Sequence, residues 1–479
     1  MRERERAAEA RRPQRGERSS FSLSALPPRP LRLCGFSFSL SLALLWSSGA
    51  RANPLDAFGF GSRQTAMGGA VAADVSDFSA GYYNPAGLAK AQGFELSVGY
   101  FRADHFLYMN GKNSNVDPVK GMVGGAVVPG KVYNLPFAIG VGFHIPDDRL
   151  TRVRALAQDE PRWELYDNRN QRLWFGVNAA ISPFPWLQLG GGVTFMAATL
   201  ATLDISGYLD LLTPTDSSLR HEVNADLKMV AYPDFGARIE VSKDLALAVV
   251  YRGQFSLDLN VAANVLAGVG LGRSGSLTTL ALGLQTDTID SFLPQQVVVG
   301  GSWKLGETVH ANLDLTWVNW GAYVPPVTRI NTQLNVPPPQ GGWPAGIAPP
   351  TTPAPTVVLP IEIHNQVVPH VGVEWRALSR RTWQGFVRGG YEFDKSPISA
   401  QTGSTNYVDR DRHAVSAGLG VRLIHPATVL PGDVRLDVHG QLSVLPTETT
   451  LKADASDLVG DYTAGGHIWN LGFTATVGF

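Results

Sequence analysis

The sequence has little of what marks several common classes of protein. Cysteine occurs once, as Cys34, so the rest of the chain can form neither a disulfide framework nor a cysteine metal site. Charged residues make up 17% of the chain, against about 25% in ordinary soluble proteins. The formal net charge is −1, which gives no basic surface for nucleic acid. No apolar run reaches the roughly 18 residues that a membrane-spanning helix requires.

Recognisable catalytic signatures are also missing. The ten histidines show no metal-ligand spacing, and the sequence contains no HExxH, G-x-S-x-G or Walker motif. We therefore predict no metal, no cofactor and no enzymatic activity. A Ser-His or Asp-His site built from residues far apart in the sequence, as in outer-membrane lipases and proteases, stays open as an alternative.

What the sequence does contain is a long series of alternating segments. From Phe94 to the end, apolar residues alternate with small or polar ones, as they do between the two faces of a strand. The last segment, from His467 to Phe479, is about as long as a tilted strand that crosses a bilayer. Its apolar side ends on an aromatic residue, Phe479, and its other side is small or polar.

About fourteen such segments follow one another, an even number as bacterial outer-membrane barrels usually require. A membrane protein without spanning helices must be a closed barrel, because every backbone group has to pair inside lipid. We therefore predict an all-β fold, a transmembrane antiparallel β-barrel of about fourteen strands with a polar lumen. A large soluble sandwich would also carry charges on one face of its strands, so alternation alone leaves that alternative open.

Aromatic residues and loop lengths favour the membrane. Seven aromatic residues fall near predicted strand ends, where interfacial girdles belong: Trp303, Trp317, Trp320, Trp375, Trp383, Tyr391 and Trp469. Short connections alternate with long ones, as in outer-membrane barrels. The long connections are expected near 105–120, 147–169, 204–227, 260–294, 321–366, 394–411 and 445–465. The loop at 321–366 is rich in proline and should be extended and solvated.

The chain before the alternating region divides into two parts. Residues 1–52 have an Arg-rich start, an apolar run from Leu33 to Trp46 and the cleavage pattern Ala50-Arg51-Ala52, which indicates an over-long signal peptide. A disordered basic tail followed by a buried helix is the alternative. Residues 53–92 are small and glycine-rich, and Asn84 followed by Pro85 predicts the start of a short helix. We interpret 53–92 as a partly helical unit and 93–479 as the barrel.

Several motifs resemble the FadL/TodX (OMPP1) family of outer-membrane transporters for long-chain fatty acids and other hydrophobic compounds. The likeness covers nearly all of the chain after residue 52. It is carried by the following stretches: Gly68-Gly69-Ala70, Asn84-Pro85-Ala86 (the family's NPA motif), Leu293-Pro294, Leu315-Thr316-Trp317, Arg388 to Pro397, Asp409 to His413, and the terminal strand to Phe479.

The resemblance implies a 14-stranded barrel in the outer membrane of a Gram-negative bacterium, plugged by residues 53–92 as a hatch. It implies that a hydrophobic ligand is captured from outside, enters a pocket in the barrel and leaves sideways into the membrane through a kink in the third strand. That strand lies near 137–146, where Gly140, Gly142 or Pro146 could interrupt the ladder. A monomer is expected, with Phe479 recognised by the barrel assembly machinery.

One departure from the family concerns the ligand's carboxylate, which the family's fatty-acid transporters hold with basic residues. The stretch from Gln188 to Leu219 contains no Lys or Arg. Four arginines on the polar side of their strands could substitute, namely Arg252, Arg388, Arg422 and Arg435. Alternatively they pair with carboxylates as lumen structure, with these as candidate partners: Asp258, Asp314, Glu374, Glu392 and Asp437. Uncharged ligands such as aromatic hydrocarbons are then candidates.

The expected function is passive uptake of hydrophobic compounds through the barrel wall. Two other functions fit a barrel of this kind. One is a general diffusion porin for small hydrophilic solutes, against which the plug-like segment argues. The other is a structural or adhesive barrel whose long outer loops bind partners.

Overall fold

The computed structural model describes residues 54–148, 159–167, 172–210, 213–270, 276–323, 329–338, 342, 352, 359, 361–426 and 432–479. All of them belong to the second of the two units into which the chain divides, Ser47–Phe479. The expected signal peptide and much of the proline-rich loop lie outside the described residues.

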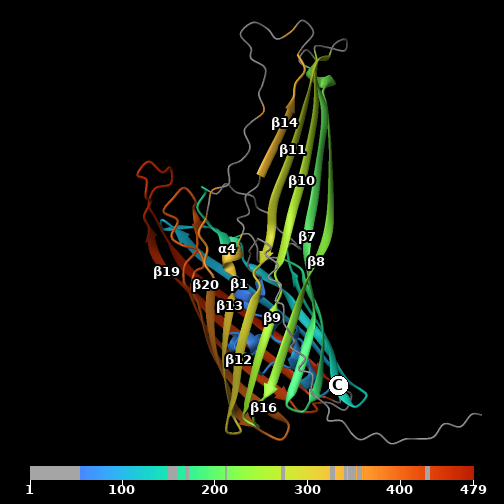
Figure 1. Ribbon diagram of the computed structural model, residues 1–479, viewed down its shortest axis with the longest axis vertical. Coiled ribbons are helices and arrows are strands. Elements are labelled where there is room, and N and C mark those ends of the chain that lie inside the picture. Colours follow the sequence, from blue (N-terminus) through green and yellow to red (C-terminus); the bar gives the residue numbers. More distant parts are fainter. Residues whose placement is uncertain are drawn as a thin grey trace, which may run out of the picture. The chain divides into compact units, whose positions relative to one another are not determined.

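Fourteen strands form one closed antiparallel ring (Figure 1). The ring closes where the last strand pairs with the first, from Glu95 opposite Gly478 to Met109 opposite Ala464. Its order is β1 (Glu95–Met109), β3 (Val119–Val132), β4 (Leu135–Pro146), β6 (Trp174–Phe184), β7 (Leu187–Asp210), β8 (Ser218–Glu240), β9 (Leu245–Arg252), β12 (Gln296–Leu305), β13 (Val309–Val318), β15 (Gln366–Ser379), β16 (Trp383–Asp394), β18 (Arg412–Leu423), β19 (Val434–Thr450) and β20 (Tyr462–Gly478). The predicted all-β fold and strand number are confirmed, and the alternative of a two-sheet sandwich is wrong.

The alternating pattern places apolar side chains on the outside of this ring. On β19, Leu436 and Val438 are exposed, whereas Asp437 and His439 between them are buried in the interior. The neighbouring strands repeat this arrangement, since exposed Leu419 and Phe473 both lie opposite Val438. An apolar outer wall around a polar interior suits a barrel that stands in hydrocarbon.

Three more strands extend the sheet beyond the ring, where the sequence analysis expected loops. They are β10 (Phe255–Gly270), β11 (Ser276–Leu293) and β14 (Arg329–Asn335). β10 runs parallel to the outer part of β7, and β11 and β14 add antiparallel strands to it (Figure 1). The prediction of long loops near 204–227 and 260–294 is therefore wrong, because alternation continues past the barrel and marks no boundary in the sequence.

The remaining connections alternate as expected, short at one end of the ring and long at the other. The long ones carry β2 (Lys112–Asn113), β5 (Arg162–Trp163), α4 (Glu164–Asp167), η3 (Trp320–Ala322) and β17 (Tyr407–Val408), whereas η2 (Pro214–Asp216) lies in the short turn between β7 and β8. β5 and β17 pair in parallel and join two of these connections. Tyr323 donates a hydrogen bond to Glu164 over 2.8 Å, which fixes a third connection to α4.

The N-terminal segment is helical, as predicted. It contains α1 (Pro54–Phe58), α2 (Ser62–Ala66), α3 (Ala80–Tyr83) and the 3-10 helix η1 (Pro85–Lys90). Asn84 caps η1 by accepting a hydrogen bond from the Ala86 backbone over 3.0 Å, with Pro85 in the first turn. Among the described residues, no helix has the length and apolarity to cross a membrane.

A charge on the outer wall should destabilise the barrel. Val438→Lys puts an ammonium group on the apolar face of β19, between exposed Leu436 and Val444, and we expect the free energy of unfolding in phospholipid vesicles to fall by about 2 to 4 kcal/mol. Thr449→Lys is the matched control, because Thr449 is exposed on the same strand beyond the apolar wall. Denaturant titration checks both, and equal stability of the two variants would contradict the assignment of the outer face.

Candidate functional site

Polar side chains of the barrel interior hold the N-terminal helices mostly through main-chain carbonyl groups. These contacts come from six strands of the wall, which surround the segment that we call the hatch, residues 54–92. The donors and their acceptors are Asn178 to Gly81 (3.3 Å), Arg238 to Ala73 (2.6 Å), Arg252 to Tyr82 (2.9 Å), Asn312 to Ala70 (2.8 Å), His370 to Gly68 (2.9 Å) and Asn470 to Phe58 (2.8 Å). Side chains on six strands of the wall therefore hold the hatch by hydrogen bonds.

Glycines of the wall let the hatch backbone approach closely between these donors. A Cβ atom at Gly390 would lie 2.1 Å from the Gly68 nitrogen, and one at Gly372 would lie 2.5 Å from the Met67 oxygen. Real Cβ atoms do not approach backbone this closely, so a larger residue at either position would force the hatch to move. Gly68 itself has φ +63°, a left-handed conformation that favours glycine.

The Asn84-Pro85-Ala86 motif lies against two strands of the wall. The Asn84 side chain is fully buried and donates to the Ala72 carbonyl over 2.7 Å. A Cβ at Gly190 of β7 would lie 2.4 Å from the Ala86 nitrogen. One at Gly236 of β8 would lie 2.1 Å from the Asn84 side-chain oxygen. The motif therefore seats the hatch at the β7–β8 pair.

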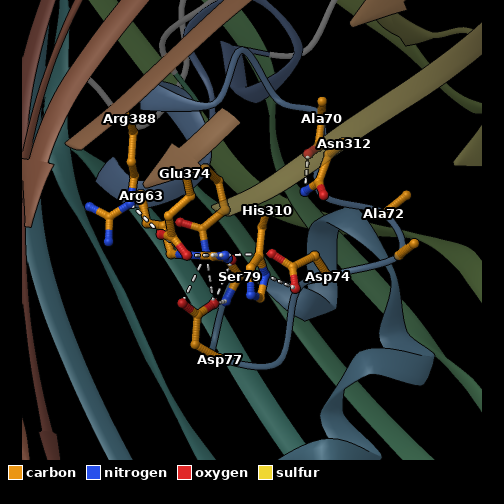
Figure 2. Close-up of polar contacts among 12 residues, drawn as sticks. Arg63, Ala70, Ala72, Asp74, Asp77, Ser79, His310, Asn312, Glu374 and Arg388 are labelled. Atoms are coloured by element: carbon orange, nitrogen blue, oxygen red, sulfur yellow. Dashed lines mark hydrogen bonds and ion pairs between the residues drawn. The ribbon is translucent and has the colours of Figure 1, made fainter. Parts of the chain in front are cut away.

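A buried ion-pair cluster fixes the other side of the hatch (Figure 2). Arg63 of α2 lies 2.9 Å from Glu374 of β15 and 2.5 Å from Asp74 of the hatch. Glu374 also contacts Arg388 of β16 at 2.5 Å, and Arg388 reaches Asp437 of β19 at 2.7 Å. Alternating charges thus connect the hatch to three strands.

Burial by itself would raise the pKa of the Asp74 carboxyl. The adjacent Arg63 guanidinium and His310 nevertheless hold that pKa well below its usual value. Asp74 therefore stays ionised at and below neutral pH, and its contribution to seating the hatch is lost only as pH falls through this lowered pKa.

A cavity lies between the hatch and the ends of the strands that carry the long connections. Its empty volume is about 1000 Å³, including the part open to solvent. Much of its lining is apolar and aromatic: Leu55, Tyr82, Tyr83, Leu165, Tyr166, Val298, Val318, Trp320 and Val368. This mainly apolar lining suits an apolar ligand.

The charged groups around this cavity are already engaged with one another or with the hatch. Arg252 donates to the Tyr82 carbonyl and to Gln296. Arg412 pairs with Glu392 and with Asp394. Counted formally, the lining has four carboxyl groups, Asp56, Asp314, Glu392 and Asp394, against these two guanidinium groups. The cavity therefore offers a poor environment for an incoming carboxylate.

The other three candidate arginines lie around a second cavity, which is lined by polar groups near the short connections. Arg388, Arg422 and Arg435 line it together with Arg63 of the hatch. Arg422 pairs with Asp433 over 2.6 Å, and Arg435 pairs with Glu95. Arg388 has two of the partners expected from the sequence, Glu374 and Asp437. The structure thus separates Arg252 from the other three, with the hatch lining both cavities.

The candidate gate strand is β4, the third strand of the ring as expected. Its ladder has no register shift, either from Leu135 to Pro146 against β3 or from Phe137 to His144 against β6. Gly140 and Gly142 face the hatch, where a Cβ would lie 2.7 Å from Leu88 and 3.2 Å from Phe60. In the described residues these glycines accommodate the hatch within a continuous ladder, and their role in ligand exit stays a prediction.

Two parts of the cavity were missed in the sequence. Trp320 was assigned to the aromatic girdle, but it is 5% exposed and lines the cavity, because the chain turns inward at η3. Leu165 and Tyr166 lie on α4, in a connection expected to be an irregular loop. A helix of a single turn leaves no periodic pattern in the sequence. By contrast, Asn312 and His370 lie on the polar side of their strands, so the sequence already predicted that they face the interior.

Nothing in the described part of the chain suggests a metal centre, since no group of three or more His, Cys, Asp or Glu side chains could hold an ion.

Enlarging one glycine of the wall should unseat the hatch. We expect Gly390→Val to give steady ion conductance in planar bilayers, because its side chain would overlap the Gly68 and Met67 backbone. Gly389→Val is the matched control, since a Cβ there has only the Ser416 oxygen within 4 Å, at 3.9 Å. Both variants should still form barrels that resist unfolding in cold detergent. Equal conductance of the two would show that the clash does not decide closure.

Removing the hatch's arginine should give a pH-dependent leak. Arg63→Met leaves buried Asp74 without its cation, which costs about 3 kcal/mol and raises the open population about a hundredfold at pH 7. The pKa of Asp74 then rises, so lowering the pH towards 5 should partly reclose the hatch, whereas the unmodified protein stays closed over that range.

The matched control for Arg63→Met is Lys90→Met. It breaks another pair between hatch and wall, with Glu240, whose side chains are about one-third exposed. Single-channel recording at several pH values distinguishes them, and a leak independent of pH in Arg63→Met would contradict the electrostatic explanation.

Comparison with known proteins agrees with this architecture. No family model matches the chain. Alkane uptake protein A of Marinobacter nauticus is 24% identical over 416 residues, which cover 81% of this chain and 83% of that protein. A FadL homologue of Pseudomonas aeruginosa superposes with a TM-score of 0.54 at 13% identity, covering 88% of this chain and 98% of its own. The monoaromatic hydrocarbon channel CymD gives 0.52 at 15% identity, covering 88% and 97%.

These likenesses are too distant in sequence to transfer a ligand, but they agree on architecture. The chain has the fold of the FadL/TodX outer-membrane barrels, and the resemblance found in its sequence motifs is confirmed at the level of the fold.

Proposed function

We propose that the protein is a channel in the outer membrane of a Gram-negative bacterium and takes up uncharged hydrophobic compounds passively. Alkanes and aromatic hydrocarbons are the substrate class that we favour over fatty acids. The observation that carries this choice is the charge around the apolar cavity, where four carboxyl groups face two guanidinium groups that already have partners.

The names of two similar proteins point the same way. The Marinobacter relative is an alkane uptake protein, and CymD is a monoaromatic hydrocarbon channel. An apolar molecule gains roughly 25 cal/mol for each square ångström of surface that it buries, so apolar walls can hold it without any charged partner.

The proposed route begins on the side of the long connections, enters the apolar cavity and leaves sideways through the wall into the membrane. A lateral exit avoids water on the far side, and it leaves the hatch in place. The β4 region is the proposed exit, since Gly140 and Gly142 allow hatch residues Leu88 and Phe60 to pack directly on this strand.

The parts of the chain take on roles consistent with this function. We infer that residues 1–52 are a removable signal peptide, that 53–92 are the hatch and that 93–479 are the barrel. Phe479 would serve as the recognition point for the barrel assembly machinery, and the barrel would act as a monomer in outer-membrane lipid. A general porin fits less well, because a hatch held from six strands obstructs an aqueous pore.

A carboxylate added to the cavity should impede uptake. Val368 lines the cavity on β15 and is 5% exposed, so we expect Val368→Asp to lower the uptake rate of radiolabelled hexadecane or toluene at least fivefold. Val367→Asp is the matched control, because Val367 is the outward neighbour near the end of the same strand, where a charge costs about 0 to 1 kcal/mol.

Cells that express the unmodified protein should take up neutral hydrocarbons several-fold faster than cells without it, and palmitate at the same rate. Uptake of palmitate alone would overturn the proposed substrate class. Large steady ion currents from the unmodified protein would instead favour the porin.

A further inference from the structure

The sheet formed by the outer parts of β7 and β8 continues beyond the barrel wall. The last residue of β7 that pairs with β6 is Met196, opposite Trp174. From Thr202 to Asp210 the same edge of β7 pairs with β10 instead, which continues the sheet through β11 to β14. The range Ala197–Asp210 spans roughly 45 Å at about 3.3 Å per residue, so the extension reaches far past the wall (Figure 1).

This extension has one apolar and one polar face. Residues that lie opposite one another in the printed register share a face. Val223, Leu203 and Ala263 form one apolar row, and Ile205, Val265 and Leu282 form the next, which His221 interrupts at its β8 end. The opposite face carries Asp204, Ser206, Arg220, Glu222, Asn224 and Asn264, together with the apolar pair Leu266 and Ala281.

The apolar face lies on the same side of β7 and β8 as the lipid-facing wall. Side chains alternate along β7, so Leu203 and Ile205 are on the same side as Leu189 and Val193, which face outward in the barrel. On β8 the exposed residues Phe235, Met229, Val223 and Leu219 have the same parity. Leu219 is 75% exposed and Val223 is 61% exposed, although both lie far from the ring.

An apolar sheet face of this extent is unusual on a surface bathed only by water. Because its residues have the same strand parity as the surface that contacts hydrocarbon, its occupant should have the chemistry of hydrocarbon. The polar face, where Asn264 donates to Asp204 over 3.0 Å, can remain solvated.

We propose that the apolar face formed by β7, β8, β10 and β11 of this extension is an adsorption surface for a liquid hydrophobic phase. A droplet or film of uncharged hydrocarbon binds to this face outside the membrane. Its molecules then reach the lipid-facing wall and the mouth of the barrel along one apolar surface, without crossing water. The inference rests on the proposed function for its physiological purpose, but the surface and its binding can be tested separately.

The test uses the full-length protein in cells and, after purification, in lipid nanodiscs. Leu219→Lys/Val223→Glu places two opposite charges on the apolar face without changing the net charge. Ser206→Glu/Asn224→Lys is the matched control, because it places the same two charges on the polar face. Both variants leave the cavity and hatch intact, and neither touches the barrel wall.

Two measurements are compared. The first is the fraction of nanodiscs that float with hexadecane droplets, and the second is hexadecane uptake by cells from an emulsion and from detergent micelles. We expect the apolar-face variant to lose at least fivefold in flotation and in uptake from emulsion, while its uptake from micelles stays within twofold of the unmodified protein. The control variant should match the unmodified protein in all three.

Equal flotation of the apolar-face variant and the unmodified protein would overturn the inference, as would equal losses in both variants. Cross-linking of Val223→Cys into dimers, with no flotation of the unmodified protein, would show that a second copy covers this face. Flotation that depends on the apolar face, with no uptake from emulsion or from micelles, would support the adsorption surface and contradict the proposed transport function. Failure of the inference and failure of the proposed function can therefore be told apart.

Discussion

The hydrogen bonds between wall side chains and hatch backbone are the interaction on which the rest of the structure depends. A closed ring of strands satisfies its own backbone and leaves a polar interior that must find partners. The hatch supplies those partners as carbonyl groups, which accept from Asn312, Arg238, His370 and other side chains whatever the hatch side chains are. The hatch therefore fills the lumen, and its backbone is the main hydrogen-bonding partner of the side chains of the wall.

This constraint explains why glycines stand between long polar residues at inward positions of β15 and β16 beside the hatch. On β15 three successive inward residues are His370, Gly372 and Glu374, and on β16 they are Arg388, Gly390 and Glu392. His370 and Glu374 reach across to the hatch, and the glycines on these strands allow its backbone to approach the wall. A glycine in place of a long polar residue would leave the hatch without that contact. A long side chain in place of a glycine would clash with the hatch backbone.

The same seating of the hatch separates two chemical environments. The cavity towards the long connections is largely apolar, and its two guanidinium groups already have partners within the protein. The cavity towards the short connections is polar and contains Arg388, Arg422 and Arg435. A hydrophobic molecule therefore meets a favourable environment on one side of the hatch only. This difference between the two cavities supports the proposed route, which never enters the second cavity.

The sequence by itself determined the features that depend on short-range periodicity. Alternation gave the fourteen-stranded barrel and the inward parity of Arg388, while the Asn84-Pro85 pair predicted the start of η1. These features are local because a strand exposes alternate residues and a helix start needs a cap. Alternation could not indicate that β9 stops at Arg252, since β10 continues the same pattern outside the ring.

Only the tertiary structure decided which interior groups meet. It separated Arg252 from the other three arginines, turned Trp320 into the cavity and assigned the glycines of the wall to contacts with the hatch. The physical reason is that parity fixes whether a side chain points inward but not its height along the barrel, which depends on strand stagger and on where the hatch sits. Partners such as Arg63 and Glu374, which are 311 positions apart, follow from that stagger and from no local pattern.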